Sequence, residues 1–328
     1  MKLVIYLKNK NLLNKIIFIL FCFLLSYLLI FQKQNLYISK DVLMLWINTL
    51  IPSLFPFLVF TEILKNSNIN YYFAKLFGFI TKIFKLPKES AICIITGFLC
   101  GYPNGAKYVS FLYEKDKIDL NTSKKLLSFI NLCNPIYVLT TIGTIIFGDI
   151  YSGLILYISH ILSAIIIGIC YPLHNIIPKN NEKVNKKTKN NTENFIKILQ
   201  DSIINAFRTL IYIFGFMIIF SILSNIIKNI LNVMNINNTL KIFLCSLFEI
   251  TSGINNLYKN IDNYIFKMIL ISFLISFSSF SVIFQVYSAC INIPKISLKN
   301  IILSKIIHGI LSALITFIIF IIFPFLII

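Results

Sequence analysis

Apolar runs long enough to cross a lipid bilayer recur along the whole chain, and this pattern excludes most other folds. A transmembrane helix needs about 20 consecutive apolar residues. Of the 328 residues 57% are hydrophobic and 13% are charged, whereas about 25% of a soluble domain is charged. We therefore expect an all-α polytopic membrane protein. The runs lie at about 16–31, 42–64, 126–147, 150–172, 203–227, 264–291 and 301–328.

One apolar run is interrupted. Residues 91–107 read AICIITGFLCGYPNGAK, so a helix breaker, an amide and two glycines stand where a spanning helix would continue. Non-helical backbone at membrane depth is tolerated where protein buries it or where it lines a water-filled cavity. The stretch predicts a re-entrant hairpin, an interruption typical of transporter binding sites. The alternative is a glycine zipper of Gly97, Gly101 and Gly105, which leaves Pro103 and Asn104 without a role.

The two halves of the chain share residues in the same order. Gly105, Ser128 and His160 of the first half return at equal spacing as Gly253, Ser276 and His308, listed in that order. Residues 55–66 and 214–225 also share a pattern of two phenylalanines, Ile-Leu and an asparagine. We expect an inverted repeat of three spans plus a re-entrant hairpin, preceded by one N-terminal transmembrane helix.

The predicted organisation has four parts: 1–40, an N-terminal anchor helix with no small-residue cleavage site behind it; 41–173, the first repeat; 174–200, a basic cytoplasmic linker; and 201–328, the second repeat. If 91–107 and 240–258 are both re-entrant, most lysines, including those at 295–305, lie on the cytoplasmic side with the N-terminus. Full crossing of both segments would leave more than half of them outside, against the positive-inside rule. Each repeat then crosses an odd number of times, which inverts the second.

Several function classes are excluded. The formal net charge of +18 suits cytoplasmic loops, and no basic run interleaved with aromatic residues indicates nucleic acid. Seven cysteines stand singly, as core residues do. Without an HExxH site, a Walker loop, a GxGxxG turn or a Ser–His arrangement, we expect no enzyme, no cofactor and no metal. His160 and His308 are expected to form a hydrogen-bonded packing pair. The expected partners are the bilayer and a small anionic substrate, while a homo-oligomer and the coupling ion stay open.

Polar residues within the apolar segments define the predicted substrate site. A broken helix tip presents backbone N–H groups at a helix N-terminus, and these groups suit an anion. For the two asparagines before Pro135 a structural kink is the alternative, and for the serines it is helix packing. The predicted substrate-binding residues are Gly101, Tyr102, Pro103, Asn104, Gly105, Lys107, Asn131, Asn134, Glu249, Thr251, Ser252, Gly253, Ser278 and Ser279.

Ionisable residues inside apolar segments are functional candidates by default. Glu249 could hold a coupling cation, carry a proton or pair with Lys107. Glu62 is expected near the cytoplasmic end of its span, where a snorkelled surface carboxylate is the alternative. Arg208 could clamp a carboxylate through two parallel hydrogen bonds, or its side chain could snorkel at the end of its helix.

These residues resemble a known family. The motif GYPNGAK at 101–107, followed by SFINLCNP at 128–135, is similar to the sporulation integral membrane protein family YlbJ, also called SpoVV. So are IPSLFPF at 51–57 and FEITSG at 248–253, and the similarity covers about 42–313. Members of this family carry nucleoside-recognition "gate" repeats related to concentrative nucleoside transporters.

The resemblance implies a transporter in the cell membrane or outer forespore membrane of a spore-forming bacterium. Its implied substrate is dipicolinate, a small planar dicarboxylate, moved from mother cell toward forespore. A nucleoside or other organic-anion carrier, or a non-transporting spore-maturation membrane protein, is the alternative. Where the family leads us to expect a glycine-rich stretch, this chain has SFSSFS at 276–281, so whether these serines line the site stays open.

Overall fold

The computed structural model is built from helices, and the part of the chain that it describes contains no β-strand. That part comprises residues 2–67, 69–172, 191–234 and 236–323. The expected all-α polytopic membrane protein is confirmed at this level. In the described residues, 5 helical segments are long and apolar enough to cross a membrane: Gln32–Asn66, Ile150–Cys170, Phe195–Val233, Tyr264–Ala289 and Leu298–Ile322.

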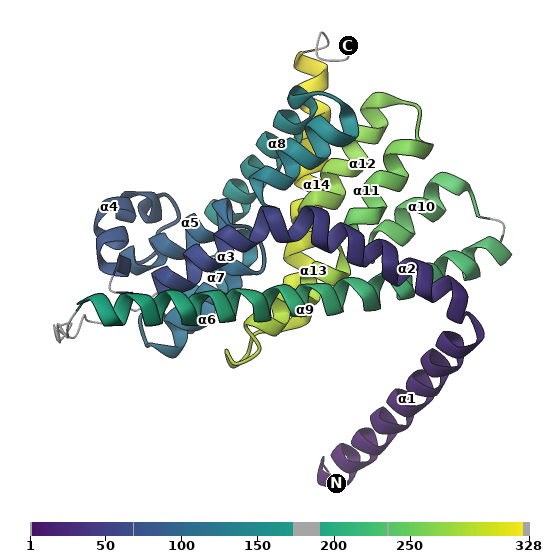
Figure 1. The fold of residues 1–328 in the computed structure, drawn as a ribbon, viewed down its shortest axis with the longest axis horizontal. Coiled ribbons are helices and arrows are strands. Elements are labelled where there is room, and N and C mark those ends of the chain that lie inside the picture. The colour runs from purple at the N-terminus through teal and green to yellow at the C-terminus, as the bar shows by residue number, and fades with distance from the viewer. Residues whose placement is uncertain (1, 68, 173–190, 235, 324–328) are drawn as a thin grey trace.

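The chain begins with a helix that projects away from the rest of the molecule (Figure 1). The apolar part of this helix, α1, is the segment Phe18–Ile30, which is largely exposed except at the buried Tyr27. The interval between the expected apolar runs 16–31 and 42–64 is also helical, because α2, η1 and α3 form one continuous helical stretch. The bounds are α1 (Lys2–Ile30), α2 (Gln32–Leu45), the π-helix η1 (Trp46–Leu50), α3 (Ile51–Asn66) and α4 (Ile69–Ile83).

The interruption predicted within 91–107 is present. After the 3-10 turn η2 (Lys88–Ser90) come two short helices, α5 (Ala91–Leu99) and α6 (Asn104–Glu114). A Cβ atom on Gly105 would lie 3.1 Å from the Cα of Gly97, so the two helices touch at glycine. The hairpin and the close glycine contact, which were alternatives at the sequence level, are therefore two aspects of one structure.

The helix after this hairpin is also broken. The expected span over 126–147 is interrupted just before Pro135, where a kink was an alternative, because the backbone is non-helical from Ile130 to Asn134. Pro135 lacks an N–H group, and the Oδ1 atom of Asn134 accepts a hydrogen bond from Ile136 N at 2.8 Å, which caps the restarted helix. The elements are α7 (Leu120–Phe129), the π-helix η3 (Tyr137–Phe147) and α8 (Ile150–Cys170).

The second half contains a comparable series of elements. The predicted linker lies mostly outside the described residues, and 191–200 form the start of α9. An uninterrupted span over 264–291 was expected; instead it breaks at Ser278 (φ 73°), and the second of the two helices begins at Ser279 (φ 62°). The bounds are α9 (Asn191–Val233), α10 (Asn238–Ser246), α11 (Ile250–Asn260), α12 (Tyr264–Phe277), α13 (Ser279–Ala289) and α14 (Leu298–Ile322).

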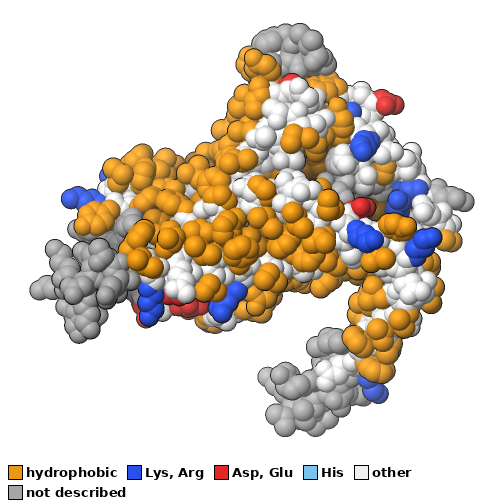
Figure 2. All heavy atoms as spheres, in the orientation of Figure 1, with side chains coloured by type: hydrophobic (Ala, Val, Ile, Leu, Met, Phe, Trp, Pro, Cys, Tyr) orange, Lys and Arg blue, Asp and Glu red, His pale blue; other side chains and the backbone are white. Residues whose placement is uncertain are grey.

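Two helix associations organise the interior. The long helix α9 runs alongside α2 and α3 (Figure 1), and Trp46 Nε1 donates to the carbonyl of Leu210 at 3.1 Å. The helix α14 packs against α12 and α8, with the hydroxyls of Ser272 and Ser312 at 2.8 Å. Hydrophobic side chains cover most of the face seen in Figure 2, and charged side chains lie mainly toward its edges. This distribution suits a protein surrounded by lipid.

Candidate functional site

Each hairpin tip is hydrogen-bonded to the break in the helix that follows it. In the first half, Tyr102 N donates to the carbonyl of Leu132 at 2.9 Å. In the second half, Phe280 N donates to the carbonyl of Leu247 at 2.7 Å. Backbone groups freed by the breaks are thus satisfied within the protein, as the interior of a membrane protein requires. In each half, we call the hairpin tip and the break that it contacts a tip–break unit.

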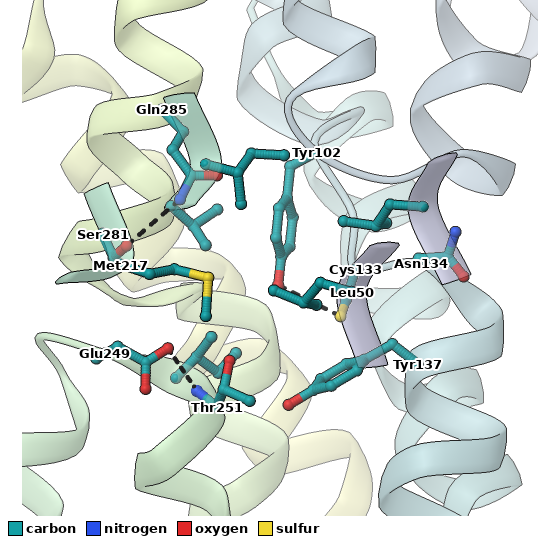
Figure 3. A pocket seen from close by; sticks show the side chains of 14 residues that line it. Leu50, Tyr102, Cys133, Asn134, Tyr137, Met217, Glu249, Thr251, Ser281 and Gln285 are labelled. Atoms are coloured by element: carbon teal, nitrogen blue, oxygen red, sulfur yellow. Dashed lines mark hydrogen bonds between the residues drawn. The ribbon is translucent and has the colours of Figure 1, made fainter. Parts of the chain in front are cut away.

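A narrow cavity, which we call the slot, lies where the two tip–break units meet the η1–α3 segment and α9 (Figure 3). Its volume is about 40 Å³, enough for water but far below the range of small-molecule sites. Both tips, the first break, the start of η3, the η1–α3 segment, α9 and α13 contribute to its wall. The lining residues are Leu50, Leu54, Tyr102, Cys133, Asn134, Tyr137, Ile213, Met217, Glu249, Ile250, Thr251, Ser281, Val282 and Gln285.

A wider, open cavity of about 600 Å³, which we call the vestibule, adjoins the slot. Ile213 and Gln285 line both cavities, while the first tip stands between them, with Tyr102 in the slot and Pro103 in the vestibule. The volume of the vestibule lies in the range of small-molecule sites. Besides Gln285, its charged and polar lining residues are Glu62, Lys65, Lys107, Ser110, Glu114, Asn205, Arg208, Thr209, Ser288 and Asn292.

Lys107 ties the first hairpin to both long helices. Its Nζ atom lies 2.6 Å from Oε1 of Glu62 on α3 and 2.7 Å from Oγ1 of Thr209 on α9. Lys65 adds a longer ion pair to Glu62 at 3.3 Å. Because the Glu62 side chain is 4% exposed, it is a buried, paired carboxylate and not a snorkelled surface group. The suggested pairing of Lys107 with Glu249 is therefore wrong.

Glu249 caps the second hairpin tip. Its Oε1 atom accepts a hydrogen bond from Thr251 N at 2.9 Å, and its Oε2 atom accepts from both N and Oγ of Ser252 at 2.7 Å. The first N–H groups of α11 are thus already bonded to a carboxylate of the same chain. This differs from the expectation that both tips offer free amides, because an anionic ligand would have to displace Glu249.

The first tip has no such cap. Pro103 occupies the N-cap position of α6 and its side chain accepts no hydrogen bond, while the N–H of Asn104 donates to the backbone carbonyl of Gly101 at 3.0 Å. Lys107 follows one turn later on the same helix. The positive end of the helix dipole and the lysine ammonium therefore favour negative charge at the same place. The second tip is therefore capped by a carboxylate of its own segment, whereas the first tip has no such cap.

The other predicted residues divide between the cavities and their support. Tyr102 and Thr251 line the slot, as does Asn134, although its amide points away from the slot in Figure 3. Asn104 supports the tip instead, since its Nδ2 atom donates to the carbonyl of Cys100 at 3.2 Å. The predicted residues that line neither cavity are Gly101, Asn104, Gly105, Asn131, Ser252, Gly253, Ser278 and Ser279.

Several cavity residues were not selected from the sequence. The Tyr137 side chain reaches the slot from the first break, and its hydroxyl points toward Thr251 (Figure 3). A tyrosine just behind Pro135 in an apolar segment was an available signal. Met217 also reaches the slot (Figure 3), but nothing local distinguishes it from the many apolar residues of α9 that face lipid or core.

A second polar cluster lies beside the breaks and outside both cavities. Lys305, which the sequence placed among the cytoplasmic lysines, is 2% exposed. Its ammonium donates to the carbonyl of Asn131 and, at 3.1 Å, to Oγ of Ser278. The prediction that Lys305 is a loop lysine is therefore wrong. Its side chain connects the first break to the second.

The two histidines meet in this cluster, as predicted. The rings of His160 and His308 stack with centroids 4.8 Å apart. The Nε2 atom of His160 accepts the N–H of Cys133 at 2.9 Å, and its Nδ1 atom lies 2.7 Å from Oγ of Ser276. The Nε2 atom of His308 lies 3.0 Å from the carbonyl of His160. These contacts make a hydrogen-bonded packing pair between α8 and α14.

Comparison with known proteins supports a membrane function. The family model described as "Gate: Nucleoside recognition" matches residues 47–151, which include the first hairpin and its broken helix. The sporulation integral membrane protein YlbJ of Bacillus subtilis (strain 168) is 24% identical to this chain over 330 residues, covering 89% of this chain and 79% of the relative. No solved structure matches the chain.

Proposed function

We propose that this multi-pass integral membrane protein, whose residues 47–151 match the Gate nucleoside-recognition model, is a transporter for a small organic anion. The observation that carries the proposal is the first hairpin tip. There an uncapped helix N-terminus and Lys107 stand at the boundary between an open vestibule and a closed slot. Gate-domain membrane proteins are typically related to transport and not to catalysis, which agrees with the absence of catalytic motifs in the sequence.

The proposed substrate is dipicolinate, moved from mother cell toward forespore. The vestibule presents Lys65, Lys107 and Arg208 against Glu62 and Glu114. A planar dicarboxylate can place one carboxylate on the guanidinium, which binds it through two parallel hydrogen bonds. Its other carboxylate can replace Glu62 at Lys107. In this proposal Glu62 holds Lys107 while no substrate is bound.

We also propose that the chain is an inverted repeat, with gate repeats at 41–173 and 201–328 behind an N-terminal anchor. Each half has a long helix, a two-helix hairpin, a broken helix and a final long helix in the same order. The long helices pack in like pairs, α3 with α9 and α8 with α14. Substrate sites of such carriers lie between the repeats, and in support of this the slot is lined by residues from both halves of the chain.

This arrangement supports a mechanism of alternating access. The slot is too small for the substrate, so the conformation described is closed at that level and open at the vestibule. To admit the substrate, the first tip must move relative to α3 and α9. Such a movement breaks the hydrogen bonds of Lys107 with Glu62 and Thr209. Substrate binding and release of the tip are thus linked through one ammonium group.

A nucleoside carrier is the second candidate, and a specific observation favours it. The matching family model is described by nucleoside recognition, and Tyr102 and Tyr137 lie in the slot wall where an opened slot could stack a base. A third candidate is a non-transporting spore-maturation protein. This function would not explain the contacts of Lys107 at the first tip with Glu62 and Thr209.

The test is uptake of labelled dipicolinate into proteoliposomes, with Glu62→Gln and the double variant Glu62→Gln/Lys107→Gln. The single variant frees Lys107 from its competitor, so we expect a lower KM. The double variant removes the ammonium without leaving a buried carboxylate unpaired, so we expect a loss of kcat/KM of about tenfold or more, the equivalent of a charge-assisted hydrogen bond. Lys65→Gln, at the outer ion pair, is the matched control and is expected to change uptake far less.

Three results would contradict this proposal in different ways. If uridine and not dipicolinate is taken up, the nucleoside carrier is correct. If neither compound is taken up by protein that melts normally in detergent, transport itself is wrong. If dipicolinate is taken up equally by all variants, the substrate stands but the first tip is not its binding site.

A further inference from the structure

Lys305 is an unusual residue for its position. It lies within α14, one of the segments apolar enough to cross a membrane, and its side chain is almost completely buried. Its two hydrogen-bond acceptors, the carbonyl of Asn131 and the hydroxyl of Ser278, are both neutral. No carboxylate pairs with it among the residues that the structure describes. A buried ammonium group without a counter-charge is costly, so some other feature must stabilise it.

That feature is the position of two helix C-termini. The helix α7 ends at Phe129 and α12 ends at Phe277, so the two acceptors of Lys305 stand one or two residues beyond these ends. A helix C-terminus carries a partial negative charge because its last carbonyl groups have no intrahelical partner. In secondary transporters, unwound carbonyls and half-helix C-termini are the groups that hold a coupling cation. The two acceptors of Lys305, a carbonyl beyond one helix end and a hydroxyl beyond another, are oxygens of the kind that such cation sites use.

The backbone at Ser278 gives a second, independent indication. Ser278 adopts the left-handed conformation (φ 73°), which glycine adopts without strain and other residues do not. Glycine would therefore be the easier residue here. It would, however, lack the hydroxyl that accepts the hydrogen bond from Lys305. A polar oxygen facing the ammonium thus stands at a strained position.

We infer that the ammonium group of Lys305 is a tethered cation that fills a monovalent-cation site between the two broken helices. The carbonyl of Asn131 and the hydroxyl of Ser278 are its ligands, and the C-terminal ends of α7 and α12 supply the negative potential. With its own cation in place, the protein needs no free alkali ion at this point. Because the ligands come from both halves, the same group holds the halves together.

The experiment removes the ammonium and offers free cations in its place. Purified full-length Lys305→Ala is melted in detergent with sodium, potassium or methylammonium chloride, and choline chloride keeps the ionic strength constant. We expect the variant to melt below the wild type in choline and to recover, saturably and selectively, with one of the small cations. The wild type is expected to melt equally in all four salts. Lys305→Met fills the space with an apolar chain and is expected to show no recovery.

A second comparison keeps the proposal falsifiable if Lys305→Ala fails to fold. Lys305→Gln retains a hydrogen-bond donor but no charge, so a tethered cation predicts that it melts as low as Lys305→Met. A glutamine variant as stable as the wild type would reduce Lys305 to a hydrogen-bond donor and overturn the inference. So would a folded alanine variant that is indifferent to every cation. These readouts need no transport and stand apart from the proposed substrate.

Discussion

The two hairpin tips border the same slot, yet they differ in charge. The first tip begins α6 without a side-chain cap and carries Lys107 one turn later, whereas the second begins α11 under the carboxylate of Glu249. The breaks differ as well: five non-helical residues, 130–134, follow the first hairpin, and Ser278 alone separates the helices after the second. The second tip is thus covered by its own carboxylate, and the first is not.

This difference shows that like elements can have unlike roles. A helix N-terminus is an anion site only when its N–H groups are free, and a neighbouring carboxylate removes that property. The proposed substrate therefore engages the first half by charge and the second half by shape. The following substitutions test that division, beginning with the largest expected effect.

Gly97→Ala is expected to destabilise the first hairpin most. A Cβ atom at this position would overlap the carbonyl oxygen of Ile130, which begins the first break. A backbone atom cannot move aside as a side chain can. We therefore expect the free energy of unfolding to fall by about 3 kcal/mol, seen as a lower melting temperature in detergent. In the second hairpin, Gly253→Ala would place its Cβ 2.6 Å from Cβ of Ser246 and is expected to cost about 2 kcal/mol.

Gly215→Ala is the control for both glycine substitutions, because a Cβ at this position meets nothing within 4 Å. It is expected to leave melting unchanged or slightly raised. Wild-type melting of Gly97→Ala would mean that the first hairpin is not seated on the break, and the contrast between the two tips would lose its basis.

Glu249→Ala is expected to destabilise the second tip by about 2 kcal/mol, since the N–H groups of Thr251 and Ser252 lose their acceptors. Glu249→Gln keeps one carbonyl oxygen as an acceptor, so it should lower the free energy of unfolding by about half as much. Thermal melting of the purified variants measures both effects. Should Glu249→Ala melt like the wild type, the cap does not stabilise α11, and the second tip is as available to an anion as the first.

Ser279→Gly is expected to have the smallest effect, in the stabilising direction. Ser279 has φ 62°, a conformation that glycine adopts without strain, and its buried hydroxyl has no hydrogen-bond partner among the described residues. Glycine relieves the backbone strain, but it also gives the unfolded chain more conformational freedom. The net effect is an increase in the free energy of unfolding of about 0.5–1 kcal/mol. Ser128→Gly, in the regular helix α7 of the first half, should lower the melting temperature instead. A lower melting temperature for Ser279→Gly than for the wild type would show that the second break is not strained.

The sequence identified the first hairpin and most of the long helices because their signals are local. Pro103, flanked by Gly101 and Gly105, interrupts an apolar run, and proline and glycine act on the backbone where they stand. Pro135 likewise marked the first break. The second break carries no such residue: its serines would be helical elsewhere, and Ser278 is held by Lys305 on a distant helix.

The sequence by itself determined that this chain is a helical membrane protein with an interrupted segment at 91–107, since apolar length and helix breakers act within a few residues. Only the tertiary structure decided which polar groups satisfy one another: Glu249 the second tip, Glu62 the ammonium of Lys107, and two helix ends the ammonium of Lys305. The physical reason is that a buried charge takes whichever partner the packing brings within hydrogen-bond distance. In the last two cases that partner lies far away in the sequence.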